Sequence, residues 1–209
     1  MSNFFNRSFQ EWVYFIGLMI AGESIYMLPF MRKTFQTSME EVYQISSTEI
    51  GILNTMFGVL AIICYYPSGS LADRYRVKEL LIFSLVSTGI GGLCMLIVNS
   101  FSGLLIIHAI WGITSILTFW AALIKATRNW ADLDQQGKGF GLLDAGRGAV
   151  AAIIASIATY SFTLADTTSL SLYNVILVYS LAPIIAALTI FFSMKRMDVP
   201  RTDDLQEKA

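Results

Sequence analysis

The sequence predicts an all-α integral membrane protein with six transmembrane helices. Of its 209 residues, 55% are hydrophobic and only 14% are charged, and the mean hydropathy is +0.61. These values lie well outside the balance of an ordinary soluble domain. The apolar residues are gathered into six long runs that are continuously apolar rather than alternating, which favours helices over the strands of a barrel.

Each run is long enough to cross a bilayer, because a hydrocarbon core about 30 Å thick needs about 20 apolar residues in a helix. The predicted spans cover about residues 12–31, 49–68, 80–98, 103–124, 140–164 and 172–194. Residues 1–194 therefore form one predicted transmembrane domain. The polar residues 195–209 are predicted to be a cytoplasmic tail or the start of a central linker.

Taken in order, each span has its own boundary signals. The first begins at Trp12, a typical interface anchor, and is too long and lacks the cleavage site expected of a signal peptide. A polar segment with Glu40 and Glu41 leads to the second, and a charged loop leads to the third. Short turns, Asn-Ser-Phe-Ser-Gly and Ala-Asp-Thr-Thr-Ser, precede the fourth and the sixth, and a longer polar loop precedes the fifth.

Basic residues predict the orientation, because short cytoplasmic loops collect Lys and Arg. Of the basic residues outside the predicted spans, only Arg32 and Lys33 fall on the side predicted to be external. Both termini are therefore predicted to be cytoplasmic. The basic residues on the predicted cytoplasmic side are Arg7, Arg74, Arg76, Lys78, Lys125, Arg128, Lys138, Lys195, Arg196, Arg201 and Lys208.

Four ionisable residues lie inside the predicted spans, where an ionisable group is a functional hypothesis by default. Glu23, near the centre of the first span, is the best single candidate for solute binding or proton coupling. The alternative is a carboxylate that pairs with Arg147 or a hydroxyl only to fix helix registration. His108, in the fourth span, is a candidate cavity residue, or a buried group that makes an interhelical hydrogen bond.

Asp144 and Arg147 are three residues apart in the fifth span, which places them on one helical face within ion-pairing distance. Two interpretations remain open for them. The pair anchors the inner part of the span, or Arg147 recognises an anionic solute.

The third and sixth spans contain no ionisable residue, whereas the first, fourth and fifth do. If the six spans form two three-helix repeats, the first member of each lines a cavity and the third faces lipid or scaffold, as in transporters.

The loop between the second and third spans reads Gly-Ser-Leu-Ala-Asp-Arg-Tyr-Arg-Val-Lys, residues 69–78. This segment, in a predicted cytoplasmic loop, resembles the signature of the major facilitator superfamily, G-x-L-a-D-r-x-G-r-k. Two positions depart from it, because Arg76 replaces the second glycine and Val77 replaces a basic residue. The resemblance covers six spans, the N-terminal half of the twelve that family members usually have, and it implies half of a twelve-helix facilitator fold in a bacterial inner membrane.

The resemblance also implies that the loop is a conformational latch at the cytoplasmic gate. Asp73 would meet a helix end, Arg74 would secure the gate and Gly69 would permit tight packing. The basic residues of the loop are also explained by the positive-inside rule alone. The predicted gate residues are Gly69, Leu71, Asp73, Arg74 and Lys78.

A second family pattern places an arginine four residues before a glycine in the fourth span. Gly112 matches the glycine, but His108 occupies the arginine position. The resemblance therefore argues against an arginine-based proton mechanism and favours a cavity position for His108.

These observations favour a secondary active transporter that moves a small polar or anionic solute by alternating access, with proton coupling through Glu23 as one option. The alternative is a non-transporting six-helix module that assembles with a partner. An enzyme is disfavoured, because we find no hydrolytic triad, metal-ligand cluster or phosphate loop in the sequence. We expect no cofactor, no metal and no nucleic acid. The expected partners are a small-molecule solute and membrane lipid. If the chain is truncated or split, a second six-helix half is expected, and if it pairs with itself, a second copy of the chain.

Overall fold

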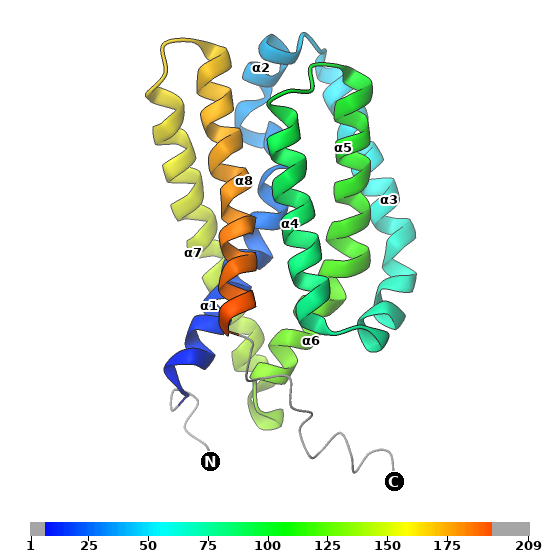
Figure 1. The fold of residues 1–209 in the computed structure, drawn as a ribbon, viewed down its shortest axis with the longest axis vertical. Helices are drawn as coiled ribbons and strands as arrows, with labels where there is room; N and C mark the ends of the chain where they lie inside the picture. Colours follow the sequence, from blue (N-terminus) through cyan, green and yellow to red (C-terminus); the bar gives the residue numbers. More distant parts are fainter. Residues whose placement is uncertain (1–6, 194–209) are drawn as a thin grey trace.

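The computed structural model describes residues 7–193, and within this range every regular element is a helix. The helices stand side by side as an upright bundle, with α2 at one end (Figure 1). The elements are α1 Phe9–Met27, α2 Arg32–Tyr43, α3 Ser47–Arg74, α4 Val77–Met95, α5 Phe101–Ile113, the π-helical segment η1 Thr114–Trp120, α6 Ala121–Trp130, the short 3₁₀ turn η2 Leu133–Gln135, α7 Gln136–Thr163 and α8 Thr168–Ser193.

Among the described residues, five helical stretches are long and apolar enough to cross a membrane. They are α3, α4, the continuous stretch from α5 through η1 to α6, the stretch from η2 through α7, and α8. The pair α1 and α2, bent by 42°, passes the same test when taken together and brings the number to as many as six. The pairing of these spans into two three-helix repeats stays a prediction.

The first helix ends earlier than the predicted boundary near Met31. Helix α1 ends at Met27, and residues 28–31 form a turn before α2 begins. Pro29 contributes to the break, because proline has no backbone N–H and cannot make the helical hydrogen bond to the carbonyl four residues earlier.

The polar segment with Glu40 and Glu41 that leads to the second predicted span is an amphipathic helix, α2, which covers one end of the bundle. Phe35, Met39 and Tyr43 of α2 are buried. The Tyr43 hydroxyl donates to the carbonyl of Met95 at the end of α4, at 2.9 Å. The Phe35 ring lies 5.4 Å from that of Phe162 on α7. Helix α2 therefore ties together the ends of helices that are distant in the sequence.

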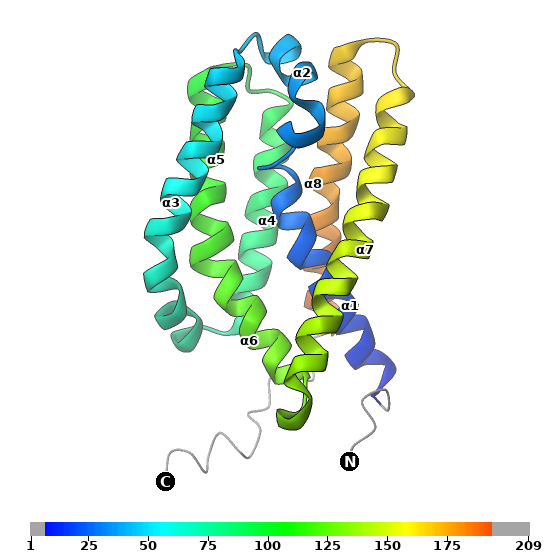
Figure 2. The same cartoon turned by 180° about the vertical axis from the view of Figure 1, so that it is seen from behind.

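The interior of the bundle is built around α8 and α4. Helix α8 packs along α4, α1 and α7, while α3 packs along α5 and η1. In contrast, α3 and α7 lie at opposite edges of the bundle and bury little of their surface within the chain (Figures 1 and 2). Large parts of these two helices are therefore available to lipid or to a partner.

At the opposite end of the bundle from α2, the start of α1 is fastened to the connection between α6 and α7. The Arg7 guanidinium lies 4.3 Å from the centre of the Trp130 ring and pairs with Asp132 at 3.1 Å. Trp130 also stacks on Phe15, with 3.8 Å between ring centroids, and its indole N–H donates to the carbonyl of Glu11 at 3.0 Å. These contacts fix the position of α1 against the end of α6.

Apart from Arg147, the described basic residues fall at the two ends of the bundle. The start of α1, the α3–α4 and α6–α7 connections and the described end of α8 share one end, and α2 with Arg32 and Lys33 occupies the other (Figure 1). Which side of the membrane each end faces stays a prediction. The predicted tail 195–209, with Lys195, Arg196, Arg201 and Lys208, lies outside the described residues.

Candidate functional site

Three of the four predicted intramembrane residues lie together between α1 and α7. Arg147 of α7 pairs with Glu23 of α1 at 3.6 Å and with Asp144 on its own helix at 3.2 Å. Its Nε donates to the backbone carbonyl of Gly22 at 3.1 Å. We call Glu23, Asp144 and Arg147 the Arg147 cluster.

Two glycines allow α1 and α7 to approach closely enough to form this cluster. A Cβ atom on Gly22 would lie 2.9 Å from Cδ of Arg147, and one on Gly146 would collide with the sulfur of Met19. Any larger residue at Gly22 would therefore displace the Arg147 side chain from its carbonyl acceptor. The small residues around Glu23 and Arg147 thus position the cluster.

The three side chains of the cluster differ in their exposure. Those of Arg147 and Glu23 are 21% and 25% exposed, whereas that of Asp144 is 73% exposed. The electrostatic attraction between Arg147 and Glu23 is therefore screened less than that between Arg147 and Asp144. The Trp120 ring, with its centroid 5.9 Å from Cζ of Arg147, adds a weak contact with the same cation.

The cluster contains two carboxylates and one guanidinium, and each nitrogen of the guanidinium already faces an oxygen acceptor. An anionic solute would have to compete with both carboxylates for Arg147. A proton on Glu23, by contrast, would weaken one ion pair while Asp144 and the Gly22 carbonyl continue to hold the arginine. This geometry is better suited to proton exchange than to direct capture of an anion.

His108 does not join the cluster. It is buried, its Nδ1 donates to the carbonyl of Leu104 on its own helix at 2.9 Å, and its ring lies edge-on to Trp111 at 5.0 Å. The hydrogen bond lies within α5, whereas the alternative interpretation expected one between helices, so the role of His108 stays a prediction. The neighbouring Gly112 marks a close crossing, because a Cβ atom there would lie 2.5 Å from the backbone oxygen of Phe57 on α3.

The loop-motif residues lie where α3 ends and α4 begins. The Asp73 carboxylate pairs with Lys125 of α6 at 3.3 Å, and Lys78 donates to the carbonyl of Phe191 on α8 at 2.9 Å. Leu71 is partly buried and packs against a cluster of buried apolar residues that includes Ala72 and Leu80, while Arg74 is exposed. Gly69 is also exposed, and nothing within the described chain lies within 4 Å of the position that its Cβ would take.

Sequence reasoning missed Lys125, because it was counted only among the basic residues that predict topology. Lys125 also donates to the carbonyl of Ala72 at 3.0 Å. The signal that could have identified it is its place at the end of the fourth span, on the same predicted side as Asp73.

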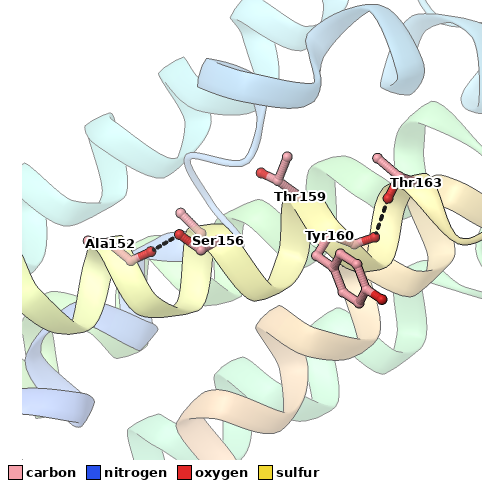
Figure 3. Close-up of a pocket in the computed structure, with 6 residues that line it drawn as sticks. Ala152, Ser156, Thr159, Tyr160 and Thr163 are labelled. Carbon is pink, nitrogen blue, oxygen red and sulfur yellow. Dashed lines mark hydrogen bonds between the residues drawn. The ribbon is translucent and has the colours of Figure 1, made fainter.

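A shallow hollow on the surface of α7 involves none of the predicted residues. Figure 3 shows that residues of this one helix line it, with Ser156 and Thr163 donating to their own helix at the carbonyls of Ala152 and Tyr160. The hydroxyl protons of Ser156 and Thr163 are therefore already used within α7. We therefore place the candidate site at the Arg147 cluster.

The sequence profile of the Major Facilitator Superfamily matches residues 11–208. The chain belongs to this superfamily. Among curated proteins, it is 29% identical over 204 residues to the inner membrane protein YqcE of Escherichia coli, covering 97% of this chain and 48% of YqcE. It is 28% identical over 183 residues to the inner membrane protein YihN of the same species, covering 88% of this chain and 44% of YihN.

A third relative, the uncharacterized protein MG294 homolog of Mycoplasma pneumoniae, is 29% identical over 146 residues, covering 64% of this chain and 31% of that protein. The chain spans about half the length of its two Escherichia coli relatives. No solved structure is significantly similar to it. Members of this superfamily are membrane transporters.

Proposed function

We propose that the chain is a secondary active transporter, or the N-terminal half of one, that moves a small polar or anionic solute by alternating access. The observation that carries the proposal is the Arg147 cluster, in which Glu23 of α1 and Arg147 of α7 meet within the bundle. Charged groups inside a membrane domain are costly and mark solute or ion pathways. Within the proposed class, the occupied guanidinium favours a polar solute over an anion.

In this proposal, Glu23 is the group that couples transport to protons. When Glu23 is ionised, its attraction to Arg147 holds α1 against α7. When it takes up a proton, that attraction is lost and the two helices can separate more easily. A proton thus biases the equilibrium between two conformations, which is the condition for coupling.

The gate at the α3–α4 connection is the second part of the proposal. Asp73 and Lys78 each contact a different helix, α6 and α8, so changes at this connection reach both of these helices. Gly69 presents an open backbone surface on α3. We propose that this surface packs against a second six-helix half or a second copy of the chain.

One further candidate function is a non-transporting membrane module that assembles with a partner. The largely unburied surfaces of α3 and α7 favour it, because apolar helices at the edges of a bundle are available for association. The two functions share the same fold and differ in whether the chain supports flux.

Reconstitution into liposomes that enclose a pH-sensitive dye tests the transport proposal. Small polar solutes and anions are added one at a time, with a pH gradient across the membrane. We expect at least one solute to drive proton movement and the Glu23→Gln variant to abolish it, since glutamine keeps the shape of the side chain but cannot exchange a proton.

Asp144→Asn is the matched control, because it removes the more exposed carboxylate of the same cluster. It should leave the pH dependence largely intact. Unchanged proton movement in Glu23→Gln would remove Glu23 from the mechanism. A stable cross-linked complex without flux for any solute would support the non-transporting module.

A further inference from the structure

We propose that Lys125 is the positioning residue of the gate, and that it acts mainly by capping the end of α3 rather than by its ion pair with Asp73. This inference deepens the proposed function, because the role of the α3–α4 connection as a gate rests on that proposal. The contacts that support it are within the described chain. Lys125 Nζ donates to the carbonyl of Ala72 at 3.0 Å and lies 3.3 Å from the Asp73 carboxylate.

The last carbonyls of a helix have no partner within the helix and carry its negative dipole end. Ala72 lies in the last turn of α3, which ends at Arg74. A lysine ammonium from another helix that binds such a carbonyl satisfies the acceptor and compensates the dipole at the same time. Lys125 thereby attaches the end of α3 to α6.

The ion pair between Lys125 and Asp73 alone holds α3 against α6 only weakly. The Asp73 side chain is 78% exposed and that of Lys125 is 39% exposed, so solvent and salt screen their attraction. The hydrogen bond to Ala72 is better shielded, since Ala72 itself is only 4% exposed. The two contacts of Lys125 therefore predict different effects for its loss and for the loss of Asp73.

This attachment also differs from the position suggested by the sequence. The resemblance implies that Asp73 meets a helix end, whereas in the structure the Asp73 carboxylate pairs with Lys125 of α6. Helix α6 continues the span that contains η1, so the position of α3 is linked to the fourth span.

Cysteine labelling tests the proposal without any solute. The reporter is Ser68→Cys, a nearly isosteric change at a buried position one turn before Ala72, in a background with Cys64→Ser and Cys94→Ser. The rate of reaction with a maleimide in membranes measures how often the end of α3 separates from the bundle. A second reporter, Ala72→Cys, guards against a local effect at Ser68.

We expect Lys125→Met, which keeps much of the length but removes the charge and the donors, to raise labelling about tenfold, as expected for loss of a hydrogen bond from a charged group. Lys125→Arg should label at the parent rate. Asp73→Asn should raise labelling by less than about threefold, because the Ala72 contact remains. The exchange Asp73→Lys with Lys125→Asp should stay as open as Lys125→Met, because aspartate cannot donate to Ala72.

Arg128→Met is the matched control, an exposed cation one turn further along α6. Labelling of Lys125→Met at the parent rate, or an equal increase in Arg128→Met, would overturn the proposal. Full rescue by the charge exchange would also overturn it and assign the effect to the ion pair. Because labelling needs no flux, failure of the transport assay would not change the labelling result. Unchanged labelling in Lys125→Met would likewise not bear on the proposed role of Glu23.

Discussion

Arg147 holds two carboxylates that differ sharply in their exposure to solvent. Replacing it by methionine leaves Glu23 without its cationic partner at a largely buried position, which is more costly than replacing either carboxylate by its amide. We expect Arg147→Met to lower the free energy of unfolding by about 1–3 kcal/mol. The measurement is the unfolding midpoint in mild detergent under increasing denaturant.

The matched comparison is Asp144→Asn, for which we expect a change below about 0.5 kcal/mol, because the Asp144 side chain is mostly exposed and its ion pair is screened. Equal losses for the two variants would show that Glu23 gains no special stabilisation from Arg147.

The sequence predicts the geometry of only one contact within the Arg147 cluster. Asp144 and Arg147 are three apart on a helix, and that local spacing led to the expected ion pair. The Glu23 pair was one of two open alternatives, because its partner lies on another helix and the helix packing decides which side chains meet. The buried environment of His108 likewise depends on packing, which no local pattern encodes.

At the scale of elements, α5 crosses α3 at Gly112, where the position of an added Cβ comes closer to backbone atoms than at any other glycine in the described structure. A Cβ atom there would lie 2.5 Å from an oxygen and 3.0 Å from Cα of the Phe57 backbone, neither of which can rotate away. We expect Gly112→Ala to destabilise the protein by about 1–3 kcal/mol through overpacking. Thermal unfolding of the purified protein measures the change.

Gly148→Ala on α7 is the control, since nothing in the described structure lies within 4 Å of its added methyl group. It should be neutral or slightly stabilising, because alanine favours a helix more than glycine does. A loss in Gly148→Ala as large as that in Gly112→Ala would point to a general intolerance of added bulk.

The sequence predicts those helices that are formed by long apolar runs. Helix α2 was missed because its polar composition resembles a loop, and only its amphipathic spacing of Phe35, Met39 and Tyr43 indicates a helix that lies on an apolar surface. The π-helical segment η1 was also missed. Its residues have no composition that distinguishes them from those of an ordinary α-helix, so the bulge depends on how the span packs.

For the whole molecule, the arrangement of charges predicts one orientation in the membrane. Helix α2 should face outward, and the end of the bundle with the α3–α4 and α6–α7 connections should face the cytoplasm. In a background without native cysteines, we expect Thr37→Cys to react with a membrane-impermeant maleimide in intact cells. Gly137→Cys should react only after the membrane is permeabilised.

Both positions are exposed in the structure, so burial does not account for a difference between them. The reverse pattern would contradict the predicted orientation, and labelling of both in intact cells would indicate a mixed population.

The contact between Arg7 and Asp132 joins residues that are 125 positions apart in the chain. At a synthesis rate of about 5–20 residues per second, Asp132 is made roughly 6–25 seconds after Arg7. The first helix therefore enters the bilayer well before the residues that fasten its beginning exist. During that interval its depth and tilt are set by lipid and by the insertion machinery, and the final position of Glu23 is reached only when the last helices arrive.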